Sequence, residues 1–312
     1  MLQHTTNETT VQVGQCVATL ISYLYNSETD TTAYTFELVY PRIIHSEFMT
    51  HRMFSRNAMS SRATPVKTML NSLDEEHYVP KEFLKNQSGM VGGEPLSEED
   101  QKFAKGYWES AYYRTREIVA SLNNLGVHKQ YINRLLEPFA FIKVIVTATE
   151  WDNFFKLRLA PDAQPEIQDL AKAIKESMAL EDKLELAVGS SCGSLPYITK
   201  EDVKELNEVG KEFSYYDSGI MDIAVSVARC ARVSYYKHDG AKPSIIEDLK
   251  LALRLFESGH LTPSEHVVFI RDGSKPKIKN LKGFFTYRDM VEWNQDMIVD
   301  DLKSVILRLE SK

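Results

Sequence analysis

"YTFELVYPRIIHSEFMTHRMFSRNAMSSR", residues 34–62, decides the fold that we expect for this chain. Residues 34–40 are rich in β-branched and aromatic side chains and predict a strand. Pro41 then suits the first turn of a helix, and the apolar residues of 42–49 recur at helical spacing. When residues 51–62 are placed on a helix, their apolar side chains form no continuous stripe. The stretch therefore predicts a strand, a docked helical turn, and a helix end that breaks into a loop.

The polar part of this stretch, residues 50–62, carries three arginines, three serines, a histidine and an asparagine. Arginine binds phosphate through parallel hydrogen bonds, and amide groups at a helix end add further donors. The composition therefore indicates an anion site. The alternative is a solvated surface helix, which is what most charge clusters form. Against that alternative, the cluster contains no Asp or Glu although the whole chain has a net charge of −7, so it should repel itself unless an anion neutralises it.

Length and composition are those of an ordinary globular chain, with 312 residues of which 43% are hydrophobic and 26% charged. The acidic balance argues against a nucleic-acid-binding or membrane-surface protein. The apolar runs are shorter than the roughly 18 residues that cross a bilayer, and the polar N-terminus is unlike a signal peptide. Three widely spaced cysteines without a C-x-x-C pattern argue against disulfides and structural zinc. We therefore expect a cytoplasmic protein without a metal site.

The rest of the chain predicts strands and helices in mixed order. We predict strands at 11–24 and 266–270, and a loop over 64–96, where prolines, glycines and charges are scattered. We predict a helix that begins at Ser97 and ends at Gly126, and others over 130–160, 166–178, 219–232 and 244–258. No repeat, low-complexity tract or linker divides the sequence. The pattern predicts one mixed α/β domain over residues 1–312.

The segment "GHLTPSEH", residues 259–266, brings several polar side chains together between a predicted helix and a predicted strand. A zinc motif of the H-x-x-E-H type would need a histidine at 262, where Thr262 stands. Glu265 and His266 are adjacent and would diverge on a strand. The segment therefore either caps the next element or contacts a ligand through His260, Thr262 and Glu265.

Arg158 lies just before the break at Pro161, close to an aromatic run. A buried guanidinium needs a partner. The spacing leaves two alternatives open, namely an ion pair with Asp162 or Glu166 and contact with a ligand. Arg134, in "NRLLEP", raises the same question.

Together these segments resemble the flavin-dependent thymidylate synthase family. The family signature is Arg-His-Arg, seven variable residues and Ser, with an inner Ser, an inner Asn and a final Arg. The matching residues here are His51, Arg52, Ser55, Asn57, Ser60 and Arg62. Four other pieces are similar to family segments: "TFELVYPRIIHSEFMTHR", which leads into the signature, "GHLTPSEHVVF", "ARVSYY", and "NFFKLR" with "AQPEI".

The order of these pieces differs from that of most family members. The Ala-Arg-Val-Ser and Gly-His pieces usually precede the signature, whereas here they follow it, as in a circular permutation. Residues 34–180 would then hold the nucleotide and FAD signature, and residues 218–290 would hold the FAD-contacting Ser and Gly-His segments. Chain termini often lie close together at a domain surface, so permutation can preserve a fold.

The resemblance implies an α+β fold, with a mixed, mainly antiparallel sheet and flanking helices, assembled as a homotetramer with shared active sites. It also implies an enzyme, a methyltransferase of dTMP biosynthesis. FAD would be reduced by NADPH, and methylenetetrahydrofolate would supply the carbon that converts dUMP to dTMP. The flavin performs the chemistry while the protein positions and polarises the substrate. No protein nucleophile is needed, which fits a chain without the cysteine motif of folate-only thymidylate synthases.

The resemblance assigns roles to single residues. The FAD contacts would be His51, Arg52, Met53, Glu150, Asn153, Ser234, His260, Thr262 and Glu265. The nucleotide-binding residues would be Glu47, Ser60, Ser61, Arg62, Arg134 and Arg158, with Arg134 reaching the phosphate from another subunit. Arg158 would be catalytic, because it would face the pyrimidine edge and stabilise developing negative charge.

The chain departs from the family at three positions. Thr50 stands in place of the first Arg of the signature, Ala58 in place of a Glu, and Glu47 in place of a Gln. The exchange at 47 replaces an amide by an acceptor and leaves open a related methyl- or hydroxymethyltransferase that acts on another pyrimidine deoxynucleotide, such as dCMP. The exchanges at 50 and 58 leave open a nucleotide-binding homologue that lacks catalysis.

Overall fold

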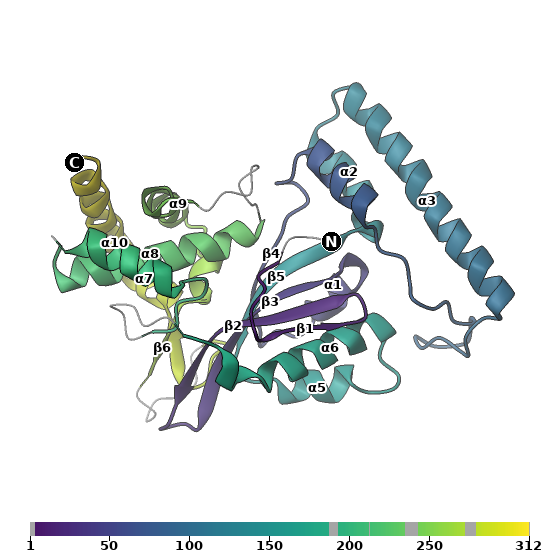
Figure 1. The fold of residues 1–312 in the computed structure, drawn as a ribbon, viewed down its shortest axis with the longest axis horizontal. Helices are drawn as coiled ribbons and strands as arrows, with labels where there is room; N and C mark the ends of the chain where they lie inside the picture. Colours follow the sequence, from purple (N-terminus) through teal and green to yellow (C-terminus); the bar gives the residue numbers. More distant parts are fainter. Residues whose placement is uncertain (1–3, 187–192, 212, 235–242, 272–278, 312) are drawn as a thin grey trace.

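A five-stranded antiparallel sheet forms the centre of the structure, in the strand order β1-β2-β3-β5-β4 (Figure 1). The computed structural model describes residues 4–186, 193–211, 213–234, 243–271 and 279–311. The strands of this sheet are β1 (Thr10–Val13), β2 (Cys16–Asn26), β3 (Thr31–Pro41), β4 (Ser55–Ala58) and β5 (Phe141–Ala148). Helices flank both faces of the sheet, so the predicted fold class is confirmed.

Strand β3 and the short helices after it follow the prediction for residues 34–49. Pro41 ends β3, and η1 (Arg42–Ile44) and α1 (His45–Phe48) continue from it. The prediction for 11–24 is corrected, because two strands replace one. A two-residue turn at Gly14 and Gln15 joins β1 to β2, and Gly14 has a φ of +55°, which a glycine adopts without strain.

The helix predicted over 130–160 is wrong. The segment forms α4 (Lys129–Leu135), η2 (Glu137–Phe139), strand β5 and α5 (Asp152–Arg158). All eight residues of β5 are buried, because helices or loops cover both of its faces. A strand buried on both sides shows no alternation of polar and apolar residues, so its sequence cannot be told from that of a buried helix.

A helical arm lies beside the sheet (Figure 1). The loop predicted over 64–96 contains α2 (Val66–Glu75), so that prediction is corrected. Its buried face packs with α4 and with α3 (Glu98–Asn124). The predicted start of α3 is confirmed, since the Ser97 hydroxyl accepts a hydrogen bond from the backbone N–H of Asp100 at 3.2 Å.

One face of the sheet packs against α6 (Pro165–Met178), as Figure 1 shows. Of the periodic apolar residues that predicted this helix, Ile167, Leu170 and Ile174 are buried, whereas Met178 at its end is half-buried. They meet the side chains of alternate strand residues such as Phe36 and Val144. This interface is apolar and holds the N-terminal half of the chain together.

The other face of the sheet meets the C-terminal helices. These are α7 (Lys200–Gly210), α8 (Tyr215–Ala231), α9 (Ile245–Glu257) and α10 (Tyr287–Glu310), with η4 (Arg232–Ser234), η5 (Thr262–Glu265) and the pair β6 (Val268–Ile270) and β7 (Phe284–Thr286). The short η3 (Glu181–Lys183) stays on the α6 side, where Glu181 accepts a hydrogen bond from the Tyr34 hydroxyl at 2.6 Å. Helices α8 and α9 confirm the predictions over 219–232 and 244–258, and β6 confirms a shorter strand than the one predicted over 266–270.

Polar contacts join the sheet to this C-terminal layer. The amide of Asn57 on β4 donates to the carbonyl of Cys230 on α8 at 2.9 Å. The Nδ1 atom of His266 lies 2.9 Å from the hydroxyl of Thr147 on β5. The two sequence blocks that carry the family-like segments therefore pack directly on each other.

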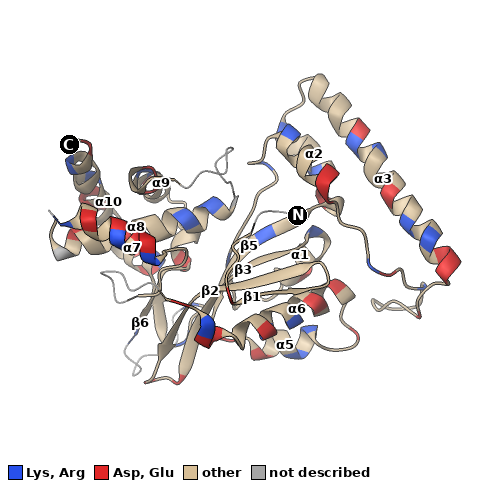
Figure 2. Cartoon of the chain, viewed as in Figure 1, with Lys and Arg blue, Asp and Glu red and all other residues tan. Residues whose placement is uncertain are grey.

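Charges of both signs are interspersed on the helices of the arm and the C-terminal layer, as the blue and red bands of Figure 2 show. One buried network lies inside the C-terminal layer, where Arg229 bridges the fully buried carboxylates of Asp202 and Asp248 at 2.6 and 3.1 Å. Among the described residues, no helix is long and apolar enough to span a bilayer.

Candidate functional site

The turn between α1 and β4 presents the first half of the polar segment. Backbone hydrogen bonds from Thr50 to Glu47 and from His51 to Phe48 continue the helical winding for one more turn. The Arg56 guanidinium then donates to the carbonyls of Met49 and His51 at 2.9 and 3.1 Å. Arg56 is therefore structural. Its positive charge is balanced by backbone carbonyls, so no bound anion is needed to neutralise it.

A cavity of about 150 Å³ opens beside this turn. Its walls come from the turn and from α5 with the residues before it, two segments about 100 positions apart in the sequence. The lining residues are Thr50, His51, Arg52, Met53, Phe54, Glu150, Asn153, Phe154, Leu157 and Arg158. Six of these are predicted site residues, so the structure brings together side chains that were assigned from separate motifs.

Arg158 joins the two walls of the cavity. Its Nε donates to Nε2 of His51 at 2.8 Å, its Nη1 pairs with the Glu47 carboxylate, and its Nη2 lies 3.4 Å from the Thr50 hydroxyl. The ion pair with Asp162 or Glu166 that the spacing left open is not formed. Glu166 instead accepts a hydrogen bond from the Tyr78 hydroxyl at 2.6 Å. The partner of Arg158 is Glu47, at one of the positions where the chain departs from the family.

His51 is neutral at this site. Burial, aided by the positive charges of Arg158 and Arg56, lowers its pKa from an ordinary 6.5 to about 4. Since Nε2 accepts from Arg158, the single ring proton is on Nδ1. The imidazole stacks on Phe54 and meets the edge of Phe154, with ring centroids 5.8 and 4.9 Å apart. The ring is thus a fixed acceptor that orients Arg158.

The second half of the polar segment, residues 59–64, forms a loop at the other end of β4. This strand has four residues and spans roughly 14 Å, so the two halves of the segment are separate sites. Ser60 is half-buried, Ser61 is buried, and Arg62 is exposed. Arg134, also exposed, lies on α4, which contacts this loop. The structure therefore places Arg134 beside the loop of its own chain. Its reach into another subunit stays a prediction.

The Ser61 hydroxyl already has a hydrogen-bond partner within the chain. Its hydroxyl donates to Oε1 of Glu137 at 2.6 Å, and the Arg42 guanidinium lies 3.0 Å from the same oxygen. Backbone carbonyls of the loop are held by α4, with Lys129 donating to Ala63 and Asn133 donating to Ser61 at 2.8 Å each.

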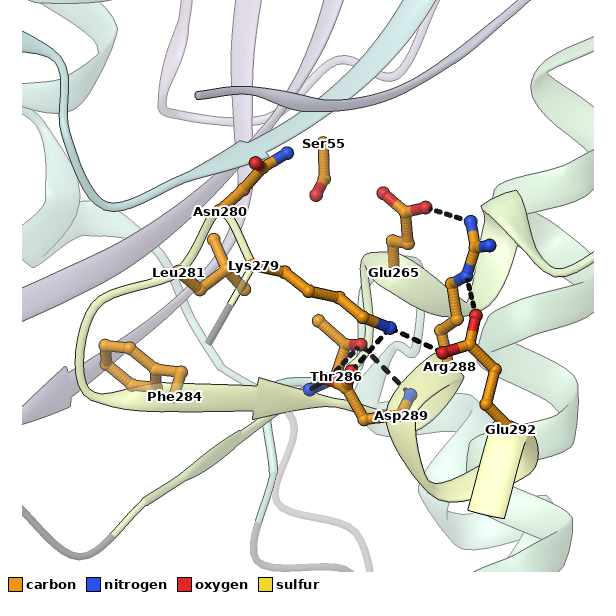
Figure 3. Close-up of a pocket in the computed structure, with 10 residues that line it drawn as sticks. All are labelled: Ser55, Glu265, Lys279, Asn280, Leu281, Phe284, Thr286, Arg288, Asp289 and Glu292. Atoms are coloured by element: carbon orange, nitrogen blue, oxygen red, sulfur yellow. Dashed lines mark hydrogen bonds and ion pairs between the residues drawn. The ribbon is translucent and has the colours of Figure 1, made fainter. Parts of the chain in front are cut away.

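A second cavity, of about 300 Å³, lies where β4 meets the C-terminal layer (Figure 3). Arg288 donates to the predicted FAD contact Glu265 at 2.6 Å and to Glu292 at 2.7 Å. Lys279 pairs with Asp289 and Glu292, so the charged groups in this cavity are largely paired with one another. Among the described residues, no group of three His, Cys, Asp or Glu side chains comes together as a metal site.

The remaining predicted site residues lie near this second region. Thr262 and Glu265 are half-buried in η5, and His260 is exposed just before it. Ser234 ends η4, and its side chain lies outside the described part of the structure. The FAD contacts were predicted as one set, but the structure does not bring them into one cavity: five of them line the first cavity and Glu265 lines the second. Thr262 and His260 line neither of these cavities.

Sequence reasoning missed several side chains at these sites. Arg42, Glu137 and Asn133 surround the 59–64 loop, and Arg288 and Lys279 line the second cavity. Glu137 follows Arg134 by three residues in "NRLLEP", and this proximity was the one available signal. Arg42 and Glu137 are 95 positions apart, and nothing in their spacing indicates contact.

Comparisons with known proteins agree with the segments that form the first cavity. The family model described as thymidylate synthase complementing protein, Thy1, matches residues 2–181, more than half of the chain. The match includes the signature and Arg158 and ends before the segments that contain Ser234 and Glu265.

The chain is also similar to individual proteins. It is 29% identical over 164 residues to a flavin-dependent thymidylate synthase of Pseudothermotoga lettingae, covering 50% of this chain and 68% of that protein. It is 30% identical over 151 residues to one of Aquifex aeolicus, covering 48% of this chain and only 46% of that protein. A solved structure, the UMP/dUMP methylase PolB from Streptomyces cacaoi bound with 5-Br UMP, aligns at 20% identity and a TM-score of 0.40 over 47% of this chain and 69% of that one.

Proposed function

Because this chain belongs to the Thy1 family of thymidylate synthase complementing proteins, we propose that it catalyses the reductive methylation of dUMP to dTMP. The flavin-dependent members imply FAD as the cofactor, with NADPH and a folate as co-substrates. The observation that carries the proposal is the cavity in which Arg158 is held between Glu47 and His51. It supplies a fixed guanidinium beside exposed polar groups, as a flavin and a pyrimidine would need.

The residues of this cavity fit part of a flavin dinucleotide. Arg52 and Asn153 are exposed at the cavity and can donate to phosphate or ribose oxygens, and the rings of Phe54 and Phe154 also line it. A volume of about 150 Å³ is smaller than the roughly 300–1,000 Å³ of a typical ligand pocket. The rest of the cofactor would therefore lie outside this cavity. As part of the proposal, other copies of the chain would complete the site in a homotetramer with shared active sites.

Arg158 is the residue that we assign to catalysis. A reduced flavin, when bound, would supply the hydride that completes the methyl group. Arg158 would donate to the N3–O4 edge of the pyrimidine and stabilise the negative charge that makes the ring carbon nucleophilic. Glu47 and His51 hold the guanidinium in one orientation, so it needs little reorganisation during the reaction.

The 59–64 loop would hold the nucleotide phosphate through Ser60, Arg62 and the backbone at Ser61, with Arg134 from α4. Glu265 and Thr262 in η5 would extend the flavin site across the boundary between the two sequence blocks. Contacts between these blocks, such as that of Asn57 with Cys230, support a single permuted domain. We place the enzyme in the cytoplasm as part of the same proposal.

A second candidate substrate follows from Glu47. A carboxylate at this position can accept a hydrogen bond from the amino group of a cytosine as well as from the N3–H of a uracil. The ion pair with Arg158 would satisfy either base edge, so dCMP is the alternative substrate.

The test is reconstitution of the purified protein with FAD, followed by incubation with NADPH, methylenetetrahydrofolate and either dUMP or dCMP. We expect a methylated nucleotide whose formation requires all three additions. A product with dCMP alone would establish the second candidate. A protein that binds the nucleotide but not FAD, and forms no product, would refute the enzyme and leave a nucleotide-binding homologue.

A further inference from the structure

One carboxylate interrupts the proposed phosphate site. Oε1 of Glu137 accepts a hydrogen bond from the Ser61 hydroxyl at 2.6 Å, and the Arg42 guanidinium lies 3.0 Å from the same oxygen. A serine hydroxyl and an arginine are donors that bind a phosphate oxygen in the same way. In this chain the carboxylate of Glu137 therefore occupies donors that would suit a phosphate.

The loop does not depend on Glu137 for its position. Asn133, which is fully buried, donates to the carbonyls of Ser61 and Thr64 at 2.8 and 2.9 Å. Lys129 donates to the carbonyl of Ala63 at 2.8 Å. Because these bonds fix the backbone, the link from Glu137 to the Ser61 side chain is available for another role.

The local charges favour exchange with a more highly charged anion. Burial lowers the pKa of Arg42, and the nearby Arg134 guanidinium lowers it further, while Glu137 raises it. Arg42 therefore has a second guanidinium nearby as well as one carboxylate, so these two cations carry one positive charge more than Glu137 neutralises. A dianionic phosphate would neutralise both cations more fully. Glu137 is 23% exposed at its side chain, so it can turn toward solvent when it is displaced.

We propose that Glu137 is a resident counter-anion, which the phosphate of the nucleotide displaces, and that Arg42 then becomes a further phosphate-binding residue. The inference rests on the proposed function, since it assumes that the 59–64 loop receives a nucleotide. Glu137 lowers affinity for the phosphate group and leaves recognition of the base unchanged.

The experiment compares the binding of dUMP with that of deoxyuridine, which has no phosphate, by isothermal titration calorimetry on the full chain reconstituted with FAD. Glu137→Gln keeps the shape and a hydrogen-bond acceptor but removes the charge. We expect this variant to bind dUMP about tenfold more tightly, with deoxyuridine affinity unchanged. The matched control is Asp74→Asn, which removes the carboxylate that pairs with Arg116 on the same helical arm. It should change neither affinity.

A second variant, Arg42→Met, should weaken the binding of dUMP and leave that of deoxyuridine unchanged. This variant tests the role of Arg42 even if Glu137→Gln does not fold. The inference is overturned if wild type binds dUMP but Glu137→Gln binds it no more tightly, if both ligands gain equally, or if Arg42→Met leaves dUMP affinity intact. A reconstituted wild type that binds neither dUMP nor dCMP refutes the proposed function, and this inference with it.

Discussion

Replacing Arg158 should separate the two halves of the proposed reaction. Three of its nitrogens have different partners: Nε contacts His51 at 2.8 Å, Nη1 pairs with Glu47, and Nη2 lies 3.4 Å from Thr50. A lysine has one nitrogen and cannot keep these contacts while it also donates to a substrate. Loss of one preorganised donor to developing charge lowers kcat by about 10²–10³-fold, or roughly 2.7–4 kcal/mol. We expect Arg158→Lys near the lower and Arg158→Ala near the upper end of this range.

Stopped-flow spectroscopy measures the two steps separately. Loss of the oxidised flavin band after addition of NADPH reports the first, and single-turnover product formation from pre-reduced enzyme reports the second. Flavin reduction should be nearly unaffected in both variants. The side chains of Arg158 and Glu47 are 17% and 29% exposed, so solvent screens their pair and the unfolding free energy should change by at most about 1 kcal/mol. Equal losses in both steps would show that Arg158 is structural and refute the assignment.

Three further predictions concern stability and specificity. Arg229→Met leaves the buried carboxylates of Asp202 and Asp248 without this cation and should lower the unfolding free energy by roughly 3–5 kcal/mol in urea titrations, whereas a loss below about 1 kcal/mol would contradict the network. Burial lowers the pKa of His266 from 6.5 to about 3. Below pH 6.5 this imidazole therefore becomes protonated in the unfolded chain but stays neutral in the folded chain. Stability should therefore fall by about 2 kcal/mol between pH 7 and pH 5 through this residue, and His266→Asn should lack that part of the pH dependence. Glu47→Gln should raise the ratio of kcat/KM for dUMP over dCMP by about tenfold, and an unchanged ratio would show that Glu47 does not read the base.

Elements with a one-sided apolar pattern could be predicted from the sequence. Helix α6 exposes one face, so its buried residues recur at helical spacing, and Ser97 marks the start of α3 by its capping bond. Strand β5 could not be predicted, because burial on both faces removes the alternation that identifies a strand. Helix α2 was hidden by the prolines and charges that follow it, although Val66, Met69 and Leu73 carry the helical spacing.

The sequence identified individual residues of the site but not the contacts between them. His51 and Arg158 were both identified as candidates, since each lies in a short segment with an unusual composition. Their contact, and the ion pair of Arg158 with Glu47, depend on how β3 and β5 pair in the sheet. Asp162 and Glu166 were the predicted partners of Arg158, because sequence spacing identifies only residues that are close along the chain.

The most direct test of the central claim is the mass of the nucleotide formed in a single turnover, with wild-type protein carrying pre-reduced FAD, methylenetetrahydrofolate and dUMP. We expect dTMP from the wild type, and almost none from Arg158→Ala under the same conditions. Unchanged dUMP from a wild-type protein that holds reduced FAD would contradict the claim, as would equal yields of dTMP from the wild type and the variant.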